Sequence, residues 1–391
     1  MHYILFDGDR RESLLPLTYT RPVADIRTGI LTLREKWEKR LESPVGVLTE
    51  DYLQKKFPMD SGYDNVFIKG SLLADDDLAK AVLQLQSGQG LFFEDQLLAC
   101  RTPHAEEFRP TESFKRIEYD KSYLEICHTW DIFSLNGEAM EADFQLLTEG
   151  RTSAPVSDTN RVSHPDRIFL EAGAEVEHCV LNASAGPIYI GANALVMEGC
   201  LIRGGFALGD HGVVKMGAKI YGPTTAGPYC KIGGEINNSV LFGYSNKGHD
   251  GFLGNAVLGE WCNLGADTNN SNLKNNYAKV RLWNYASGRF DQTGLQFCGL
   301  VMGDHSKSAI NTMFNTGTVV GVNCNIFASG FPRNFIPSFS WGGTAGFSTY
   351  LPEKAFEAAR VAMQRRGLSF TAEDEALMLE VFEISRAYRK T

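Results

Sequence analysis

The sequence predicts an α/β domain over residues 1–150, followed by a left-handed parallel β-helix of hexapeptide repeats over residues 166–330. Three observations predict this order of parts. Apolar residues recur at every sixth position in the second half, small residues recur four positions after them, and strand and helix patterns alternate in the first half. A stretch rich in Ser, Thr, Pro and Asn predicts a linker over 151–165, and two helical patterns predict a C-terminal helical segment over 331–391.

Composition narrows the class of protein. The 391 residues exceed one ordinary core, and 43% hydrophobic with 22% charged residues is typical of a globular protein. A net charge of −9 argues against nucleic-acid or anionic-membrane partners. The N-terminal apolar run stops at Asp7, and no stretch approaches the roughly 20 apolar residues of a membrane span. The eight cysteines include no CxxC pair. We therefore expect a cytoplasmic protein with reduced thiols and no metal site.

The N-terminal part alternates strand and helix patterns. Residues 3–6 read as a buried strand, and residues 45–48 and 66–68 are further strand candidates. Residues 30–41 carry an apolar stripe at helical spacing, and residues 75–85 predict a second helix. This alternation predicts an α/β domain.

The period of six decides the fold of the second half. Steps of six from Ile190 meet only apolar residues at eight consecutive positions: Ile190, Val196, Ile202, Leu208, Val214, Ile220, Ala226 and Ile232. The period-six pattern resumes at Phe252, Leu258 and Leu264 and again at Phe314, Val320 and Ile326. A weaker prelude, at Ile168, Ala174 and Val180, precedes Ile190. Three short strands per coil stack such residues into an interior column, and glycines beside the column allow tight corners. Neither a strand nor an α-helix repeats at this period.

Four cysteines support the same coil. Each falls four residues after a column residue, a phase otherwise occupied by small side chains: Cys200, Cys230, Cys262 and Cys324. A narrow prism needs a second inward position that accepts only small side chains. We therefore interpret these cysteines as packing residues, not catalysts.

Residues 267–297 interrupt the period-six pattern. Residues 277–285 alternate like a strand, 286–288 predict a turn, and 289–297 can return. We expect an external hairpin over 267–297, a candidate arm onto a neighbouring subunit. Pro352 and Thr371 begin the two C-terminal helical patterns, which we expect to cover an end or a flank of the prism.

Three segments of the β-helix carry a recognisable motif. Residues 238–239 read NS, residues 249–254 read HDGFLG, and residues 259–266 read GEWCNLGA. With these spacings the chain resembles the bifunctional sugar-1-phosphate nucleotidylyltransferase/acetyltransferases, whose best-known member makes UDP-N-acetylglucosamine from glucosamine 1-phosphate. The resemblance implies a homotrimer that binds acetyl-CoA between neighbouring prisms. It implies that His249 is catalytic and that Phe252, Asn263 and Asn272 bind the acceptor.

The chemistry of this motif suits acyl transfer. The acceptor must lose a proton as it attacks a thioester carbonyl, and histidine is the side chain best matched to accept it. An asparagine such as Asn263 can hold the acceptor, and corner N–H groups can stabilise the oxyanion. By itself, a single histidine in a loop is more often structural, and only the intact spacing favours catalysis.

The basic residues of the family are altered in this chain. The lysine that supports the sugar phosphate falls on Asn237, and the family's Arg-Pro-Gly corner is at best residues 221–223. Asn237 itself and Lys219 are candidates for acceptor binding. Lys231 and Lys247 are further candidates, although each of these lysines alone is more typical of a solvated surface residue.

The N-terminal resemblance is less complete. Residues 6–18 read FDGDRRESLLPLT, which keeps Gly8 and residues 16–18 of the nucleotidylyltransferase opening but not its other glycines and arginine. The family's Mg²⁺-binding Asn-Gly-Asp corresponds to residues 69–71, which read KGS. The domain is also shortened. Arg10, Arg11 and Arg21 are candidates for phosphate binding, and Mg²⁺ is expected only if this domain is active.

Three functional hypotheses follow. The first is acyl transfer from acetyl-CoA to a sugar phosphate or nucleotide sugar, with His249 as general base. The second is sugar-1-phosphate nucleotidyl transfer, with the β-helix serving oligomerisation. The third is a non-catalytic scaffold that binds a sugar phosphate. The intact spacing of His249 and Asn263 favours the first, and the missing phosphate-loop glycines argue against the second.

Overall fold

The computed structural model describes residues 1–105, 108, 114–327 and 329–389. The other positions fall within the predicted parts 1–150, 166–330 and 331–391 and lie outside the described residues. The chain forms two compact units, one of Met1–Ile26 with Leu31–His128 and one of Arg27–Ile30 with Thr129–Thr391. The predicted succession of an α/β domain, a parallel β-helix and C-terminal helices is confirmed.

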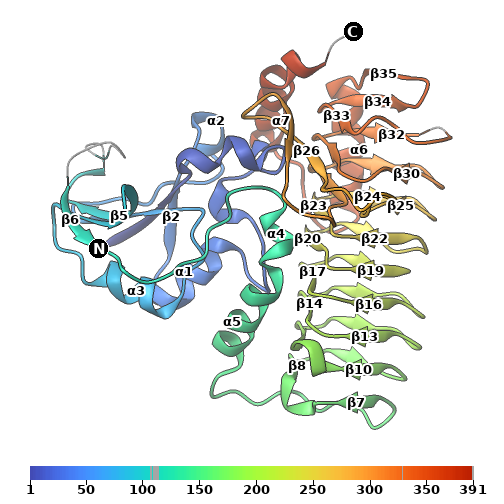
Figure 1. Ribbon diagram of the computed structural model, residues 1–391, viewed down its shortest axis with the longest axis horizontal. Coiled ribbons are helices and arrows are strands. Elements are labelled where there is room, and N and C mark those ends of the chain that lie inside the picture. The colour runs from blue at the N-terminus through green and yellow to red at the C-terminus, as the bar shows by residue number, and fades with distance from the viewer. Residues whose placement is uncertain (106–107, 109–113, 328, 390–391) are drawn as a thin grey trace. The chain divides into compact units, whose positions relative to one another are not determined.

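The first unit contains a mixed six-stranded sheet with the order β2-β1-β3-β5-β4-β6 (Figure 1). Its strands are β1 His2–Phe6, β2 Val45–Leu48, β3 Asn65–Lys69, β4 Gln89–Phe93, β5 Gln96–Thr102 and β6 Lys115–Glu118. Strands β2, β1 and β3 are parallel, whereas β5 is antiparallel to β3 and to β4. The carboxyl ends of the three parallel strands therefore meet at one edge, which is where α/β sheets bind ligands.

The helices of this unit are α1 Leu33–Leu41, α2 Asp51–Gln54 and α3 Asp76–Leu83, with single 3₁₀ turns η1 Gly8–Arg10, η2 Glu12–Leu14, η3 Leu17–Tyr19 and η4 Val23–Asp25. The helix predicted over 30–41 begins later, because Thr32 and Glu35 form a capping box at its start. Ile30 belongs to the second unit. Asp75 caps α3 by accepting from the backbone N–H of Leu78.

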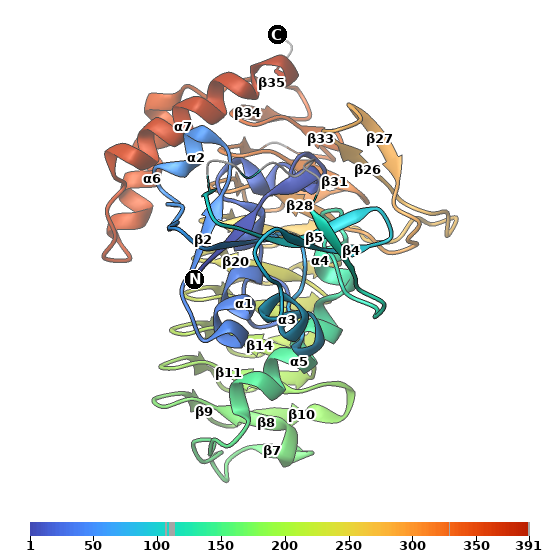
Figure 2. The same ribbon diagram turned by 90° about the vertical axis from the view of Figure 1, so that its left-hand side faces the viewer.

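The second unit is a parallel β-solenoid with three faces (Figures 1 and 2). The six-stranded face comprises β7 Arg161–Ser163, β10 Val180–Asn182, β13 Leu201–Arg203, β16 Lys219–Tyr221, β19 Glu235–Asn237 and β22 Phe252–Gly254. The nine-stranded face comprises β8 Ile168–Leu170, β11 Ile188–Ile190, β14 Phe206–Leu208, β17 Thr224–Ala226, β20 Val240–Gly243, β23 Val257–Glu260, β28 Leu300–Met302, β31 Thr318–Val320 and β33 Phe335–Ile336. The ten-stranded face comprises β9 Glu175–Val176, β12 Leu195–Val196, β15 Val213–Val214, β18 Lys231–Ile232, β21 Asn246–Lys247, β24 Asn263–Leu264, β29 Lys307–Ser308, β32 Asn325–Ile326, β34 Ser340–Gly343 and β35 Gly346–Thr349.

Two strand pairs lie outside these faces. β25 Asn269–Asn270 pairs in parallel with β30 Met313–Phe314. β26 Arg281–Asn284 and β27 Arg289–Gln292 form an antiparallel hairpin within the stretch for which we predicted one. Solenoid strands also occur in the predicted linker, at β7, and beyond residue 330, at β33 and β34.

The predicted interior column is present, but its phase is wrong at Phe252 and throughout the prelude, where Leu170 and Val176, not Ile168 and Ala174, pair with Ile190 and Val196. All eight residues from Ile190 to Ile232 in steps of six are buried, and the four cysteines of the second phase are buried and unpaired. Val180 and Phe252, however, lie on the outer side of their strands, and their neighbours Leu181 and Leu253 point inward. The corners next to these strands differ in length from the other corners. A count of exactly six residues therefore falls one position away from the inward residue.

One edge of the solenoid carries stacked rings instead of glycines. The corners between the nine- and ten-stranded faces place non-glycine residues at positive φ, among them Tyr229 (59°), Tyr244 (54°) and Trp261 (61°). The rings of Tyr229 and Tyr244 stack at 5.0 Å, and those of Tyr244 and Trp261 at 4.4 Å. Stacking offsets part of the cost of the left-handed backbone.

Helices of the second unit are α4 Asp131–Ser134, α5 Asn136–Thr148, α6 Pro352–Gln364 and α7 Ala372–Ile384, with turns η6 Pro165–Arg167, η7 Ala183–Ala185 and η8 Arg386–Tyr388. Helix α5 lies along the nine-stranded face, where Asn136 Nδ2 donates to the carbonyl of Pro223 at 2.8 Å. The two C-terminal helices lie on a flank of the last coils, and the hairpin projects on the other side (Figure 2). No helix within the described residues is long and apolar enough to cross a membrane.

Candidate functional sites

His249 lies in the corner between β21 and β22, on the edge shared by the ten- and six-stranded faces. The side chain is exposed, and no described residue makes a hydrogen bond to its imidazole. Glycines at 248 and 251 flank this corner, and a Cβ placed on Gly248 would meet only the carbonyl oxygen of Lys231, at 3.9 Å. The exposed ring is therefore accessible from solvent.

Lys247 fixes this corner from inside the solenoid. It occupies the inward position of its strand, where the register pairs it with Ile232, and it is 1% exposed. Its Nζ donates to the carbonyl oxygens of His249 at 2.5 Å, Gly233 at 3.2 Å and Asp250 at 3.3 Å. Burial lowers the pKa of Lys247 to about 8, although Asp250 and Asp267 oppose this shift. The interpretation of Lys247 as a solvated surface lysine is therefore wrong.

The predicted acceptor-binding residues fall into two groups. Asn263 is exposed on the ten-stranded face, where its Oδ1 accepts from Asn246 Nδ2 at 3.3 Å. Phe252 is half-buried on the six-stranded face, and Asn272 follows β25 and donates to Asn255 Oδ1 at 2.8 Å. Asn246 and Phe252 bracket the His249 corner on its two sides, so the corner joins the faces that bear both groups.

Asn237 and Lys219 lie on the six-stranded face. Strand β19 pairs with β22, which places Asn237 opposite Gly254 and Glu235 opposite Phe252. Lys219 is one strand further away, opposite Glu235, and its Nζ lies 3.6 Å from Glu235 Oε2. Lys219 thus has a carboxylate partner, while Asn237 is one strand from Phe252, the candidate aromatic residue of the acceptor site.

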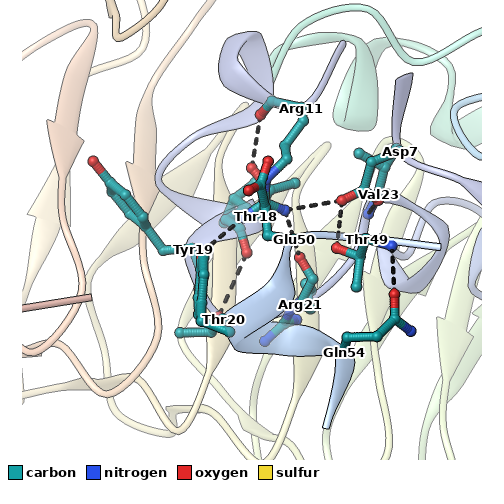
Figure 3. Close-up of polar contacts among 12 residues, drawn as sticks. Asp7, Arg11, Thr18, Tyr19, Thr20, Arg21, Val23, Thr49, Glu50 and Gln54 are labelled. Atoms are coloured by element: carbon teal, nitrogen blue, oxygen red, sulfur yellow. Dashed lines mark hydrogen bonds and ion pairs between the residues drawn. The ribbon is translucent and has the colours of Figure 1, made fainter. Parts of the chain in front are cut away.

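The first unit has a polar network at the carboxyl edge of its parallel strands (Figure 3). Asp7 accepts from the backbone N–H of Val23 at 2.7 Å, from Thr49 Oγ1 at 2.5 Å and from Arg11 at 3.1 Å. Burial raises the pKa of Asp7, although Arg11 and these hydrogen bonds oppose the shift. Arg11 also donates to Tyr52 Oη at 2.7 Å and to the carbonyl of Arg21, at 3.5 Å. Arg11 and Arg21 are both buried.

A second ion cluster lies at the same edge. Lys69 Nζ lies 2.7 Å from Glu125 Oε1 and 2.9 Å from Asp9 Oδ1, and Arg10 Nε donates to the same Glu125 oxygen at 3.0 Å. Burial would raise the pKa of Glu125, but hydrogen bonds from Lys69, Gln96 and Arg10 outweigh it and lower the pKa to about 2. Carboxylates of the chain therefore already neutralise Lys69, Arg10 and Arg11.

The sequence did not reveal Glu125 or Tyr52, which have no local motif and meet the loop only in the fold. Lys247 did carry a signal. The inward positions around it are Ile236, Leu241 and Leu253. A count that allowed spacings of four to six residues between inward positions would have placed a lysine inside the prism.

Residues 3–152 match a family model described as sugar nucleotidyl transferase. Among solved structures, the chain is similar to a UDP-N-acetylglucosamine acyltransferase from Bacteroides fragilis, with 16% identity over 60% of this chain and 84% of that chain and a TM-score of 0.34. It is also similar to the Arabidopsis UDP-N-acetylglucosamine acyltransferase, with 16% identity over 60% of this chain and 82% of that chain and a TM-score of 0.24. No curated protein matches the chain.

The family match covers the region in which the glycine-rich opening is altered. The N-terminal part of the chain is thus similar to sugar nucleotidyl transferases in spite of those departures.

Proposed function

We propose that the protein transfers an acyl group, with acetyl as the expected case, from coenzyme A to a sugar phosphate or nucleotide sugar. The observation that carries the proposal is the His249 corner: an exposed imidazole on a corner whose backbone is held by the buried Lys247, spaced from Asn263 as in the acetyltransferase motif.

The corner supplies what the reaction needs. The imidazole of His249 takes the proton from the acceptor amine or hydroxyl as that group attacks the thioester carbonyl. The thiolate of coenzyme A then leaves and recovers a proton, which restores the neutral imidazole. Asn263 and Phe252 lie on the two adjoining faces and are positioned to orient the acceptor. Backbone N–H groups of the glycine-rich corner are candidates for stabilising the oxyanion.

The proposal includes a homotrimer. Two large apolar side chains, Met216 and Ile310, are both 68% exposed and lie in corners of the same edge as His249. A neighbouring protomer seated on this edge would cover both side chains and enclose His249.

A direct test is release of the coenzyme A thiol from acetyl-CoA over a panel of sugar phosphates and nucleotide sugars. We expect turnover by the wild type and a loss of at least a hundredfold in His249→Ala, the effect of removing a general base. Equal turnover in both proteins would exclude His249 from the mechanism. No turnover by the wild type with any acceptor and acyl donor would favour the scaffold hypothesis.

Nucleotidyl transfer by the first unit is the second candidate, favoured by the family match over residues 3–152. Its chemistry fits less well, because the carboxylates of Glu125, Asp9 and Asp7 already neutralise the cations expected to face phosphate. Residues 69–71, which correspond to the family's Mg²⁺-binding Asn-Gly-Asp, read KGS and lack its carboxylate, and the ammonium group of Lys69 does not fit a cation site. Pyrophosphate release from UTP, dTTP or GTP with a hexose 1-phosphate and Mg²⁺ would establish this activity, and we expect none.

A further inference from the structure

Four cations gather on the ten-stranded face without carboxylate partners. They come from three segments of the second unit: the corner after β15, strand β18 and the end of α6. We call them the basic cluster: Lys215, Lys231, Arg365 and Arg366. No described residue forms an ion pair with any of them. In a chain with a net charge of −9, such a cluster calls for a physical explanation.

Hydrogen bonds connect the basic cluster to the candidate acylation site. Arg366 donates to Asn246 Oδ1 at 3.1 Å, and Asn246 Nδ2 donates in turn to Asn263 Oδ1 at 3.3 Å. Lys231 is directly opposite Asn246 in the register of the ten-stranded face. Strand neighbours are about 4.8 Å apart, so Lys231, Asn246 and Asn263 form a row about 10 Å long.

The basic cluster lies along the coils that lead to His249. Lys215, Gly233 and Gly248 occupy equivalent places in successive coils, each directly after the inward residue of its strand. A Cβ placed on Gly233 would meet the carbonyl oxygen of Gly248 at 2.8 Å and Lys215 Cβ at 3.0 Å, so Lys215 lies close to Gly248, the residue that precedes His249.

Packing alone does not explain the arrangement. The positive charges of two arginines at the end of α6 interact favourably with the helix dipole. That interaction does not explain why two lysines of the solenoid lie at the same place. Burial lowers the pKa of Lys231, and the positive charges of Arg366, Lys215 and Arg365 lower it further. The cluster thus carries an internal repulsion that a bound anion would relieve.

We propose that the basic cluster is a phosphate-binding subsite next to His249. A single arginine can bind two phosphate oxygens through two parallel hydrogen bonds, and lysines contribute point charges. The phosphate would belong to the sugar-phosphate acceptor or to the coenzyme A donor, an assignment that rests on the proposed function. The subsite takes over the role of the basic pair that this chain lacks at Asn237 and residues 221–223.

The test uses inorganic pyrophosphate as a probe in calorimetric titrations of the full-length protein at low ionic strength. We expect one site per chain in the wild type and at least a tenfold weaker Kd in Arg365→Gln/Arg366→Gln. Lys215→Gln/Lys231→Gln should weaken binding similarly, which keeps the test valid if the arginine variant perturbs α6. Lys354→Gln is the matched control, because it removes one charge from the same helix at a residue that has a carboxylate partner, Glu357 at 3.2 Å. Its Kd should change by less than twofold.

The outcomes separate the subsite from the catalytic proposal. His249→Ala should abolish turnover but leave pyrophosphate binding intact, so failure of the acyl-transfer proposal would not remove the subsite. With active protein, Arg365→Gln/Arg366→Gln should raise KM for the sugar phosphate alone if the acceptor's phosphate binds here, or KM for acetyl-CoA alone if the donor's phosphates do. Absence of pyrophosphate binding in the wild type, or binding in both double variants as tight as in the wild type, would overturn the subsite.

Discussion

At the scale of single residues, Lys247 links the interior of the solenoid to the candidate site. An aliphatic side chain would fill its place in the column, as Ile232 and Leu264 do in the neighbouring coils. The ammonium group instead donates to three carbonyl oxygens of the His249 corner, whose orientation no hydrophobic side chain could fix. The protein therefore keeps a buried charge at a position where stability alone would favour leucine or methionine.

This leads to a prediction about the pH dependence of stability. The pKa of Lys247 is about 8 in the folded protein and near 10.5 in the unfolded chain, so between these values the unfolded chain holds more protons. The free energy of unfolding of the wild type should rise relative to Lys247→Met from pH 8 to pH 10.5, by on the order of 3 kcal/mol. Urea denaturation of both proteins across this range measures the difference, and a constant difference would show that the lysine is not desolvated.

Glu125 gives a prediction of the opposite sign. Its pKa is lowered to about 2, so its ionised form contributes stability above pH 4.5 and loses that contribution as the pH falls toward 2. Glu125→Gln leaves Lys69 buried without its main partner and should cost about 3 kcal/mol or more at pH 7. The gap between wild type and variant should narrow in acid.

Denaturation at pH 7 and at pH 3 measures this gap. Glu118→Gln is the control, because its 2.9 Å pair with Arg116 is exposed and should be worth less than about 1 kcal/mol. A loss in Glu125→Gln no larger than in this control would show that the buried cluster contributes no stability.

At the scale of elements, α7 depends on a capping box. Thr371 accepts from the backbone N–H of Asp374, whose side chain accepts from the N–H of Thr371. Thr371→Ala should destabilise the first turn by about 1 kcal/mol, whereas Thr371→Ser keeps the oxygen and should restore it. Hydrogen exchange of the α7 amides should become about fivefold faster in the alanine variant and unchanged in the serine variant. Equal exchange in wild type and alanine variant would contradict a role for this cap.

The elements also show what the sequence could and could not predict. The solenoid was predictable because its inward column repeats at fixed spacing over many coils. Its exact phase at Phe252 was not, since corner lengths vary and only the folded chain shows which neighbour points inward. The stacked corner rings were missed because glycine was the expected residue at positive φ, while Tyr244 and Trp261 hold that conformation by packing on one another.

The candidate site was predictable only where residues adjacent in sequence act together. His249 and Asn263 were found from their spacing within one motif. The basic cluster was not, because Arg366 meets Asn246 across a separation of 120 residues. The pair of arginines before Gly367 indicated only the end of a helix. In the first unit, the ion pair of Lys69 with Glu125 was hidden for the same reason, since two separate segments supply its partners.

At the scale of the whole molecule, the proposed homotrimer predicts that assembly and activity fail together. Ile310 is exposed on the edge that carries His249, so a glutamate there would place a charge in the proposed interface. Sedimentation should show a trimer for the wild type and monomers for Ile310→Glu, with acetyl transfer lost in the variant. Leu379→Glu is the control: this residue of α7 is also exposed, at 44%, but lies on the flank formed by the C-terminal helices, and the variant should remain an active trimer. A wild-type monomer with full activity would contradict the proposed trimer, because a single chain would then complete the site.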